Sequence, residues 1–226
     1  MKKYLFILIV VAILYSRFVG LDWGLPYPMH PDERNIAVAV QSLTGLNPHF
    51  FAYGQVTIYA AFLLVKIWQL ITFSLTDISF TQAILALRFI SAVSSLGLIW
   101  VLFNIVKTLM ARSAIWKKVA VQMATLLILA FIPYGIQSAH FGTTESLLML
   151  LYASVVYKSI EVLEKNEAAG KDMIFLGLLC GTAIAVKISA LSFAIAPGMV
   201  LLYKSLKNLK SLKQLSSLFI FSFSLL

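Results

Sequence analysis

The stretch VTIYAAFLLVKIWQLITFSL, residues 56–75, decides the fold, because the side of the membrane on which each later loop lies depends on whether this run crosses. At about 20 mostly apolar residues, it is long enough to span a bilayer. However, Lys66 and Gln69 interrupt it and Trp68 lies between them, a pattern typical of a helix that anchors a protein along the membrane surface. The run alone therefore leaves two topologies open, one in which residues 56–75 cross the membrane and one in which they lie along its surface.

Composition indicates an integral membrane protein. Hydrophobic residues make up 61% of the 226 residues and charged residues 12%, whereas soluble domains have roughly 45–50% and about 25%. The net charge of +9 comes from short lysine and arginine clusters between apolar runs rather than from one basic face, which argues against a nucleic-acid partner. Cys180 is the one cysteine, so neither a disulfide nor a thiolate metal site can form within the chain.

Charge asymmetry favours the arrangement in which residues 56–75 lie flat. Cytoplasmic loops are enriched in lysine and arginine near the ends of spans. Lys2 and Lys3 precede the first apolar run, which we expect to be an uncleaved span with a cytoplasmic N-terminus. Three later loops are also basic, namely Lys107–Lys118, Lys158–Lys171 and Lys204–Lys213. These three loops lie on the cytoplasmic side, with Lys2 and Lys3, only if residues 56–75 do not cross the membrane.

Lys187 divides the apolar stretch 173–203. A single helix there would put this lysine near mid-membrane, at a cost of about 2.5–3.5 kcal/mol. Two short helices that turn at Lys187 avoid that cost, and the turn is then expected to be buried in protein rather than lipid.

We therefore expect an all-α fold: a polytopic transmembrane helical bundle, in the plasma membrane, with two surface helices in a first external loop at about residues 22–82. The predicted spans are residues 4–21, 83–107, 119–139, 145–160, 172–186 and 188–203, followed by the start of a seventh. The last apolar run has about twelve residues where a span needs about 20. Residues 1–226 are therefore expected to be the N-terminal part of a larger transmembrane domain.

Acidic residues begin two predicted helices on the external side. His30-Pro31-Asp32-Glu33 precedes an amphipathic run that stops at Gly45, and Thr143-Thr144-Glu145 begins a later span. A proline in the first turn, a threonine cap and acids near the positive end of the helix dipole are ordinary helix signals. Acids beside a bilayer can also take a proton from a hydroxyl or hold a divalent cation, so a structural and a catalytic interpretation both stand.

Basic side chains on the same side are candidates for binding a phosphate. A lysine in an apolar stretch is costly, so Lys187 is expected to be functional. Arg88 could bind a phosphate too, but at the outer start of its span we favour an arginine that reaches the lipid headgroups. His140 is expected to be an interfacial histidine, since three histidines without a cysteine pair argue against a zinc site. Residues 47–54 are expected to form a loop that closes over the site.

Read in order, five segments resemble the GT-C superfamily of integral-membrane glycosyltransferases, especially the protein O-mannosyltransferase and aminoarabinose-transferase branch. The segments are Gly24–Glu33, Asn47–Tyr59, Leu87–Ala92, Ser138–Glu145 and Gly177–Lys187. Each is weakly specific alone, whereas five in this order over nearly the whole chain are specific. Two positions depart from the family pattern: Glu145 stands where many members have aspartate, and Val186 stands where the family has threonine.

The resemblance implies transfer of a hexose or pentose from a polyprenyl-phosphate carrier to a lipid, glycan or protein acceptor outside the cytoplasm. It implies Asp32 as the base that deprotonates the acceptor hydroxyl, Glu33 as its orienting partner or fellow cation ligand, and Glu145 as the second acid. The implied residues for binding substrate or its phosphate are Lys187, His140, Arg88 and Tyr53. Family members continue through further spans that complete the carrier pocket, so the activity of this chain alone stays an open question, as does the identity of the sugar.

Two other functions stay open. A fragment of a transporter or flippase would distribute its charges through the membrane depth, and a noncatalytic membrane subunit would use its acids only as unconnected helix caps. The enzyme interpretation instead predicts that Asp32, Glu145 and Lys187 converge on one external cavity roofed by residues 46–56.

Overall fold

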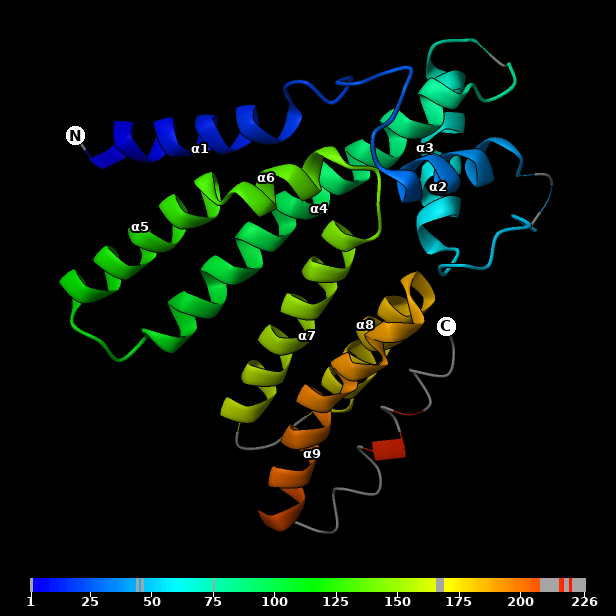
Figure 1. The fold of residues 1–226 in the computed structure, drawn as a ribbon. Coiled ribbons are helices and arrows are strands. Elements are labelled where there is room, and N and C mark those ends of the chain that lie inside the picture. The colour runs from blue at the N-terminus through cyan, green and yellow to red at the C-terminus, as the bar shows by residue number, and fades with distance from the viewer. Residues whose placement is uncertain are drawn as a thin grey trace. The chain divides into compact units, whose positions relative to one another are not determined.

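The computed structural model describes residues 2–43, 45, 47–74, 76–165, 169–207, 216–217 and 220. In this part of the chain the regular elements are nine α-helices and one 3-10 helix, which confirms the predicted all-α class (Figure 1). The chain divides into two compact units, Met1–Leu147 and Leu148–Leu226. The predicted seventh span, from residue 215 onward, lies outside the described residues apart from Ser216, Ser217 and Ile220.

A helical bundle forms the larger part of the first unit. Its helices are α1 (Lys2–Phe18), α4 (Phe80–Leu109), α5 (Ile115–Phe131) and α6 (Pro133–His140). Ser79 and Gln82 form a capping box that starts α4, since each side chain bonds the other residue's backbone N–H. Apolar side chains of α1, α4 and α5 pack together, and the buried ones are Ile9, Ile13, Ile99, Leu126 and Ala130.

Two short helices pack over the beginning of α4. They are α2 (Pro31–Gln41) and α3 (Val56–Ile71), the two helices expected in the first external loop. Proline occupies the first position of α2, as predicted, and the His30 ring caps the helix by accepting a hydrogen bond from the backbone N–H of Asp32 at 3.2 Å. The helix ends at Gln41, a few residues before the predicted stop at Gly45, which has a left-handed φ of 68°.

The packing of α3 shows how its polar residues are used. Its buried apolar residues contact α2 and only the first turns of α4, where the buried partners are Ala83, Ile84, Ala86 and Leu87. Figure 1 shows α3 crossing the beginning of α4 rather than running along its length. Lys66 donates to Gln69 at 3.2 Å, and the fully buried Gln69 donates to Gln82 at 3.4 Å. The polar residues that interrupt the run at 56–75 therefore join α3 to the start of α4.

The predicted span at 119–139 is wrong as a single helix. The chain bends by 49° between α5 and α6, at Ile132. Pro133 has no backbone N–H, so it cannot donate to the carbonyl of Leu129 and continue the helix. Ile132 adopts an extended conformation with φ −62° and ψ 118°, and α6 starts afresh at Pro133.

The second unit is a bundle of α7, α8 and α9. Helix α7 (Glu145–Glu164) starts in the first unit, and the second contains α8 (Gly170–Val186), the 3-10 helix η1 (Ile188–Ala194) and α9 (Ile195–Lys207). Asp172 is buried at the start of α8 and pairs with Lys158 at 2.9 Å and Lys165 at 2.8 Å. The predicted helix break at Lys187 is confirmed, since its backbone is extended with φ −159° and ψ 126°.

Length and hydropathy identify the best candidate spans. In the described ranges, α4 and α7 are each long and apolar enough to cross a membrane, and the bent pair α5–α6 counts as a third if it forms one span. Helices α1 and α3 and the η1–α9 segment are apolar but shorter. These helices are typical of an integral membrane protein, as the composition predicts.

Candidate active site

The buried ion pair between Glu33 and Arg88 holds α2 against α4. Both side chains have 0% exposure, and Arg88 binds the carboxylate through two nitrogens, Nε to Oε1 at 2.6 Å and Nη2 to Oε2 at 2.9 Å. Nη1 of Arg88 donates to the backbone carbonyls of Leu21 at 2.6 Å and Trp23 at 2.7 Å. Parallel bonds of this kind are strong and fix the geometry of both partners. The pair therefore ties the segment after α1, the start of α2 and the start of α4 into one structure.

Gly142 brings a third segment to the same carboxylate. Its backbone N–H donates to Oε1 of Glu33 at 2.7 Å. A Cβ atom at this position would lie 2.7 Å from Cβ of Leu87 and 3.1 Å from the Glu33 oxygen, so only glycine fits. The turn between α6 and α7 is therefore fixed directly on the Glu33–Arg88 pair.

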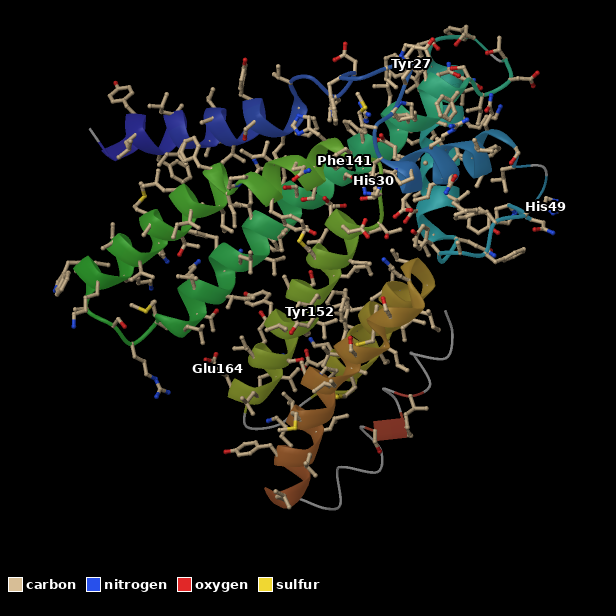
Figure 2. All side chains as sticks on the ribbon, viewed as in Figure 1. Tyr27, His30, His49, Phe141, Tyr152 and Glu164 are labelled. Carbon is tan, nitrogen blue, oxygen red and sulfur yellow. The ribbon has the colours of Figure 1, made fainter. Side chains whose placement is uncertain are left out.

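Aromatic rings surround this junction. The Arg88 guanidinium lies over the Trp23 ring at 5.4 Å, and Trp23 contacts Phe141 with ring centroids 5.6 Å apart. His30, the cap of α2, also packs against Phe141, with ring centroids 5.1 Å apart, and Figure 2 shows the His30 and Phe141 side chains close together. The rings therefore connect the segment before α2 to the turn that leads to Glu145.

Asp32, Tyr53 and Glu145 come together from three separate segments. The Tyr53 hydroxyl forms a hydrogen bond with the Asp32 carboxylate, and the charge of Glu145 also acts on it. Burial, followed by these two acids, raises the pKa of Tyr53 to about 12. The phenol therefore keeps its proton at physiological pH and is available as a hydrogen-bond donor. Tyr53 lies in the segment predicted to close over the site, and both Asp32 and Glu145 act on its hydroxyl. The convergence of Asp32, Glu145 and Lys187 on one cavity stays a prediction.

The two neighbouring acids of α2 have different surroundings. Glu33 is fully buried with both oxygens bonded, whereas Asp32 is half-buried next to Tyr53. The interpretation of Arg88 as an arginine that reaches the lipid headgroups is wrong, because its guanidinium is buried and bonded to Glu33. Its predicted role in phosphate binding stays a prediction, as does the role of Glu33 in the reaction.

The other predicted site residues lie in defined places. His140 ends α6, and its ring nitrogens lie 2.9 Å from the carbonyl of Ile136 and 3.0 Å from that of Val19. Lys187 belongs to the second unit, where its half-buried side chain projects from the break between α8 and η1. Roles for both in binding the substrate stay predictions.

No group of three or more His, Cys, Asp or Glu residues suited to a metal ion occurs among the residues whose positions are described. Both oxygens of Glu33, one of the two predicted cation ligands, are already bonded to Arg88 and Gly142.

Gly142 was not among the residues predicted for the site. One signal pointed to it, namely its place between the acid-bearing helix and the aromatic pair His140-Phe141, but a glycine in a turn is too common to single out.

Comparison with known proteins identifies a family. The sequence model described as dolichyl-phosphate-mannose-protein mannosyltransferase matches residues 68–225, which is most of the chain. The match includes Arg88, Glu145 and Lys187 and begins after Asp32 and Tyr53. It confirms the resemblance to GT-C glycosyltransferases. Searches of the curated proteins and of the solved structures found no match.

Proposed function

Because the chain belongs to the dolichyl-phosphate-mannose-protein mannosyltransferase family, we propose that it transfers a sugar from a polyprenyl-phosphate carrier to an acceptor hydroxyl on the non-cytoplasmic side of the membrane. The sugar is a hexose or pentose, and the acceptor is a lipid, glycan or protein. The reaction forms a bond from the anomeric carbon to the acceptor oxygen and breaks the bond from that carbon to the phosphate oxygen. The lipid phosphate leaves with the bonding electron pair.

One observation carries this proposal: two acids from distant parts of the sequence act on the same tyrosine hydroxyl. Asp32 comes from α2 and Glu145 from the first turn of α7, and both influence Tyr53. Unconnected helix caps would have no reason to act on one shared hydroxyl, so this arrangement supports an active site over a noncatalytic subunit. A partly buried ionisable group whose pKa is shifted by desolvation and by specific charged neighbours, as that of Tyr53 is, is a feature of functional sites.

We assign the roles from these surroundings. Asp32 takes the proton of the acceptor hydroxyl, since it is the half-buried acid and its carboxylate is oriented by Tyr53. Glu145 is the second acid of the site. For Lys187 we keep the role that the family resemblance implies, which is to stabilise the negative charge on the leaving phosphate. Glu33 and Arg88 act as positioning residues that hold Asp32 in place, so we propose no cation shared by Asp32 and Glu33.

The proposed function requires the site to face away from the cytoplasm, which in turn requires α3 to lie along the membrane. Two features support this orientation. Helix α3 has 16 residues, and four of its exposed apolar side chains, Leu63, Ile67, Leu70 and Ile71, lie on one face, while Trp68 is exposed beside them near the end of the helix. At 1.5 Å per residue its length is about 24 Å, shorter than the roughly 30 Å hydrocarbon core. An apolar stripe opposite a packed face is typical of a helix at the interface.

Cysteine labelling tests this orientation. In a Cys180→Ala background, single cysteines at Ala52 and Phe73 flank α3, and one at Arg112 lies in the loop between α4 and α5; all three native side chains are exposed. We expect a membrane-impermeant maleimide added outside intact cells to label positions 52 and 73 and to spare position 112. Labelling of only one of the two flanking positions would mean that α3 crosses the membrane, and the proposed location of the site would be wrong.

A donor-competition assay tests the reaction. Membranes that contain the full-length gene product are supplied with radiolabelled sugars on polyprenyl phosphate or, separately, on nucleotides, with the lipid-linked pool depleted in both cases. We expect product only from the lipid-linked donor, because a phosphate on a lipid carrier is the leaving group that a membrane-embedded site can bind. Equal transfer from nucleotide sugars would reject the proposed donor, and no transfer of any hexose or pentose would reject the function.

A further inference from the structure

Arg17, in the last turn of α1, is a buried charge in an apolar part of the first unit. Its side chain is 1% exposed, and no ion pair within the described residues includes it. Its guanidinium instead makes four hydrogen bonds, whose acceptors are Ser95 Oγ at 3.0 Å, Ser16 Oγ at 2.8 Å, the Leu129 carbonyl at 2.8 Å and the Ala130 carbonyl at 3.3 Å. A buried charge is unfavourable without such bonds, so this geometry is specific.

The two backbone carbonyls that Arg17 binds are those released by the break between α5 and α6. The last helical bond of α5 runs from the N–H of Ile132 to Ile128, and the first of α6 runs from Ile136 to Ile132. In an unbroken helix, the carbonyls of Leu129 and Ala130 would accept from residues 133 and 134. Proline at 133 and the turn at Ile132 remove both donors. The arginine replaces them from the neighbouring helix α1.

Small residues allow this close approach. A Cβ on Gly135 would lie 2.8 Å from Ile132 Cγ2 and 3.5 Å from Nη2 of Arg17. Ser95 of α4 accepts a bond from Arg17 and donates to the Gly135 carbonyl at 3.5 Å. The bend is therefore packed between α1 and α4, and Arg17 lies at its centre.

The direction of α6 leads to the candidate active site. At its end, the ring of His140 contacts the carbonyl of Val19, two residues after Arg17, and the next turn places the Gly142 N–H on Glu33. Glu145 follows directly and begins α7. Any straightening of the bend would move this turn away from Glu33 and from Tyr53.

We infer that Arg17 is a positioning residue for sugar transfer: by binding the carbonyls released at the α5–α6 bend, it fixes where the Gly142 turn meets Glu33 and hence where Glu145 begins α7. The inference rests on the proposed function for its effect on catalysis, whereas its effect on the bend is independent of any activity.

The bend is measured first, without an activity assay. Spin labels at Ala124 in α5 and Gln137 in α6, both exposed positions, report the distance across the break in the full-length Cys180→Ala protein. A straight helix would separate these positions by about 20 Å along its axis. We expect the wild-type distance to be shorter and narrowly distributed, and Arg17→Met to lengthen or broaden it. Arg112→Met, at an exposed arginine in the loop before α5, is the matched control and should leave it unchanged.

Pro133→Ala separates a positioning role from a merely stabilising one. Alanine returns an N–H that can bond the Leu129 carbonyl, so the double variant Arg17→Met/Pro133→Ala should fold even if Arg17→Met does not. A stabilising role predicts that this double variant regains wild-type transfer. We expect instead that it has a straighter α5–α6 segment and a kcat at least about tenfold below wild type, with little change in KM for the donor, because small misplacements of a reacting group reduce rate steeply.

Two results would overturn the inference: a wild-type distance distribution in Arg17→Met and in the double variant, or wild-type kcat in a double variant with a straightened bend. If the wild-type protein transferred no sugar, the proposed function would fail, and the distance measurement alone would still decide whether Arg17 sets the bend.

Discussion

Replacement of Asp32 by asparagine is expected to lower sugar transfer by about 10²–10⁴-fold, the usual contribution of a general base. Asparagine has the same shape and keeps an oxygen that can accept the hydrogen bond from Tyr53. It also keeps the backbone N–H that bonds the ring of His30, so α2 should still be capped. The loss would then come from the missing carboxylate charge rather than from misfolding. Initial rates with a radiolabelled lipid-linked donor measure it.

Asp22→Asn is the matched control for this variant. Asp22 is an exposed acid between Leu21 and Trp23, the two residues whose backbone carbonyls bind Arg88. The Asp22→Asn variant should transfer sugar at the wild-type rate, since the Asp22 side chain is exposed and forms no hydrogen bond or ion pair with the candidate site among the described residues. Undiminished transfer by Asp32→Asn would reject Asp32 as the base.

Loss of Arg88 is expected to have the largest effect on stability. Arg88→Met leaves the carboxylate of Glu33 buried and without its cation, and it removes the donors to the carbonyls of Leu21 and Trp23. Breaking one side of a buried ion pair typically costs about 3–5 kcal/mol in the free energy of unfolding. Reversible unfolding of the detergent-solubilised protein by increasing SDS, followed by circular dichroism, measures this loss.

The double variant Glu33→Gln/Arg88→Met tests whether the charge left behind is the cause. Its destabilisation should be smaller than the sum of the two single losses, because the neutral amide avoids an uncompensated buried charge. Arg112→Met serves again as the exposed-arginine control and should change the free energy of unfolding by no more than about 0.5 kcal/mol. An Arg88→Met protein as stable as this control would show that the pair does not hold the segments together.

Local signals in the sequence predicted the helix boundaries well where one residue dominates. The proline before Asp32 marked the start of α2, and the cost of a lysine in lipid predicted the break at Lys187. Pro133 lies within a long apolar run that predicts one continuous span, but its ring and missing N–H break the helix there. The break between α5 and α6 was therefore predictable from the sequence, because a proline inside a helical run ends or kinks the helix.

Contacts between distant segments were not predictable in this way. The partner of Glu33 lies 55 residues away, and nothing local to Arg88 distinguishes an arginine that binds a carboxylate from one that reaches a headgroup. Arg17 carries one local signal, because a charge near the end of an apolar span has to be satisfied somewhere. Its partners are backbone carbonyls released by Pro133, and only the fold brings these together.

The connections of Glu33 also constrain the order in which the protein can assemble during synthesis. This acid leaves the ribosome 55 residues before its arginine and 109 residues before the glycine amide that completes its bonding. Until α4 has been inserted, the carboxylate must remain hydrated outside the bilayer, and α2 cannot dock. The junction around Glu33 therefore forms late in membrane insertion, and ribosome-stalled chains that end before Arg88 should still expose residues 22–82 to protease.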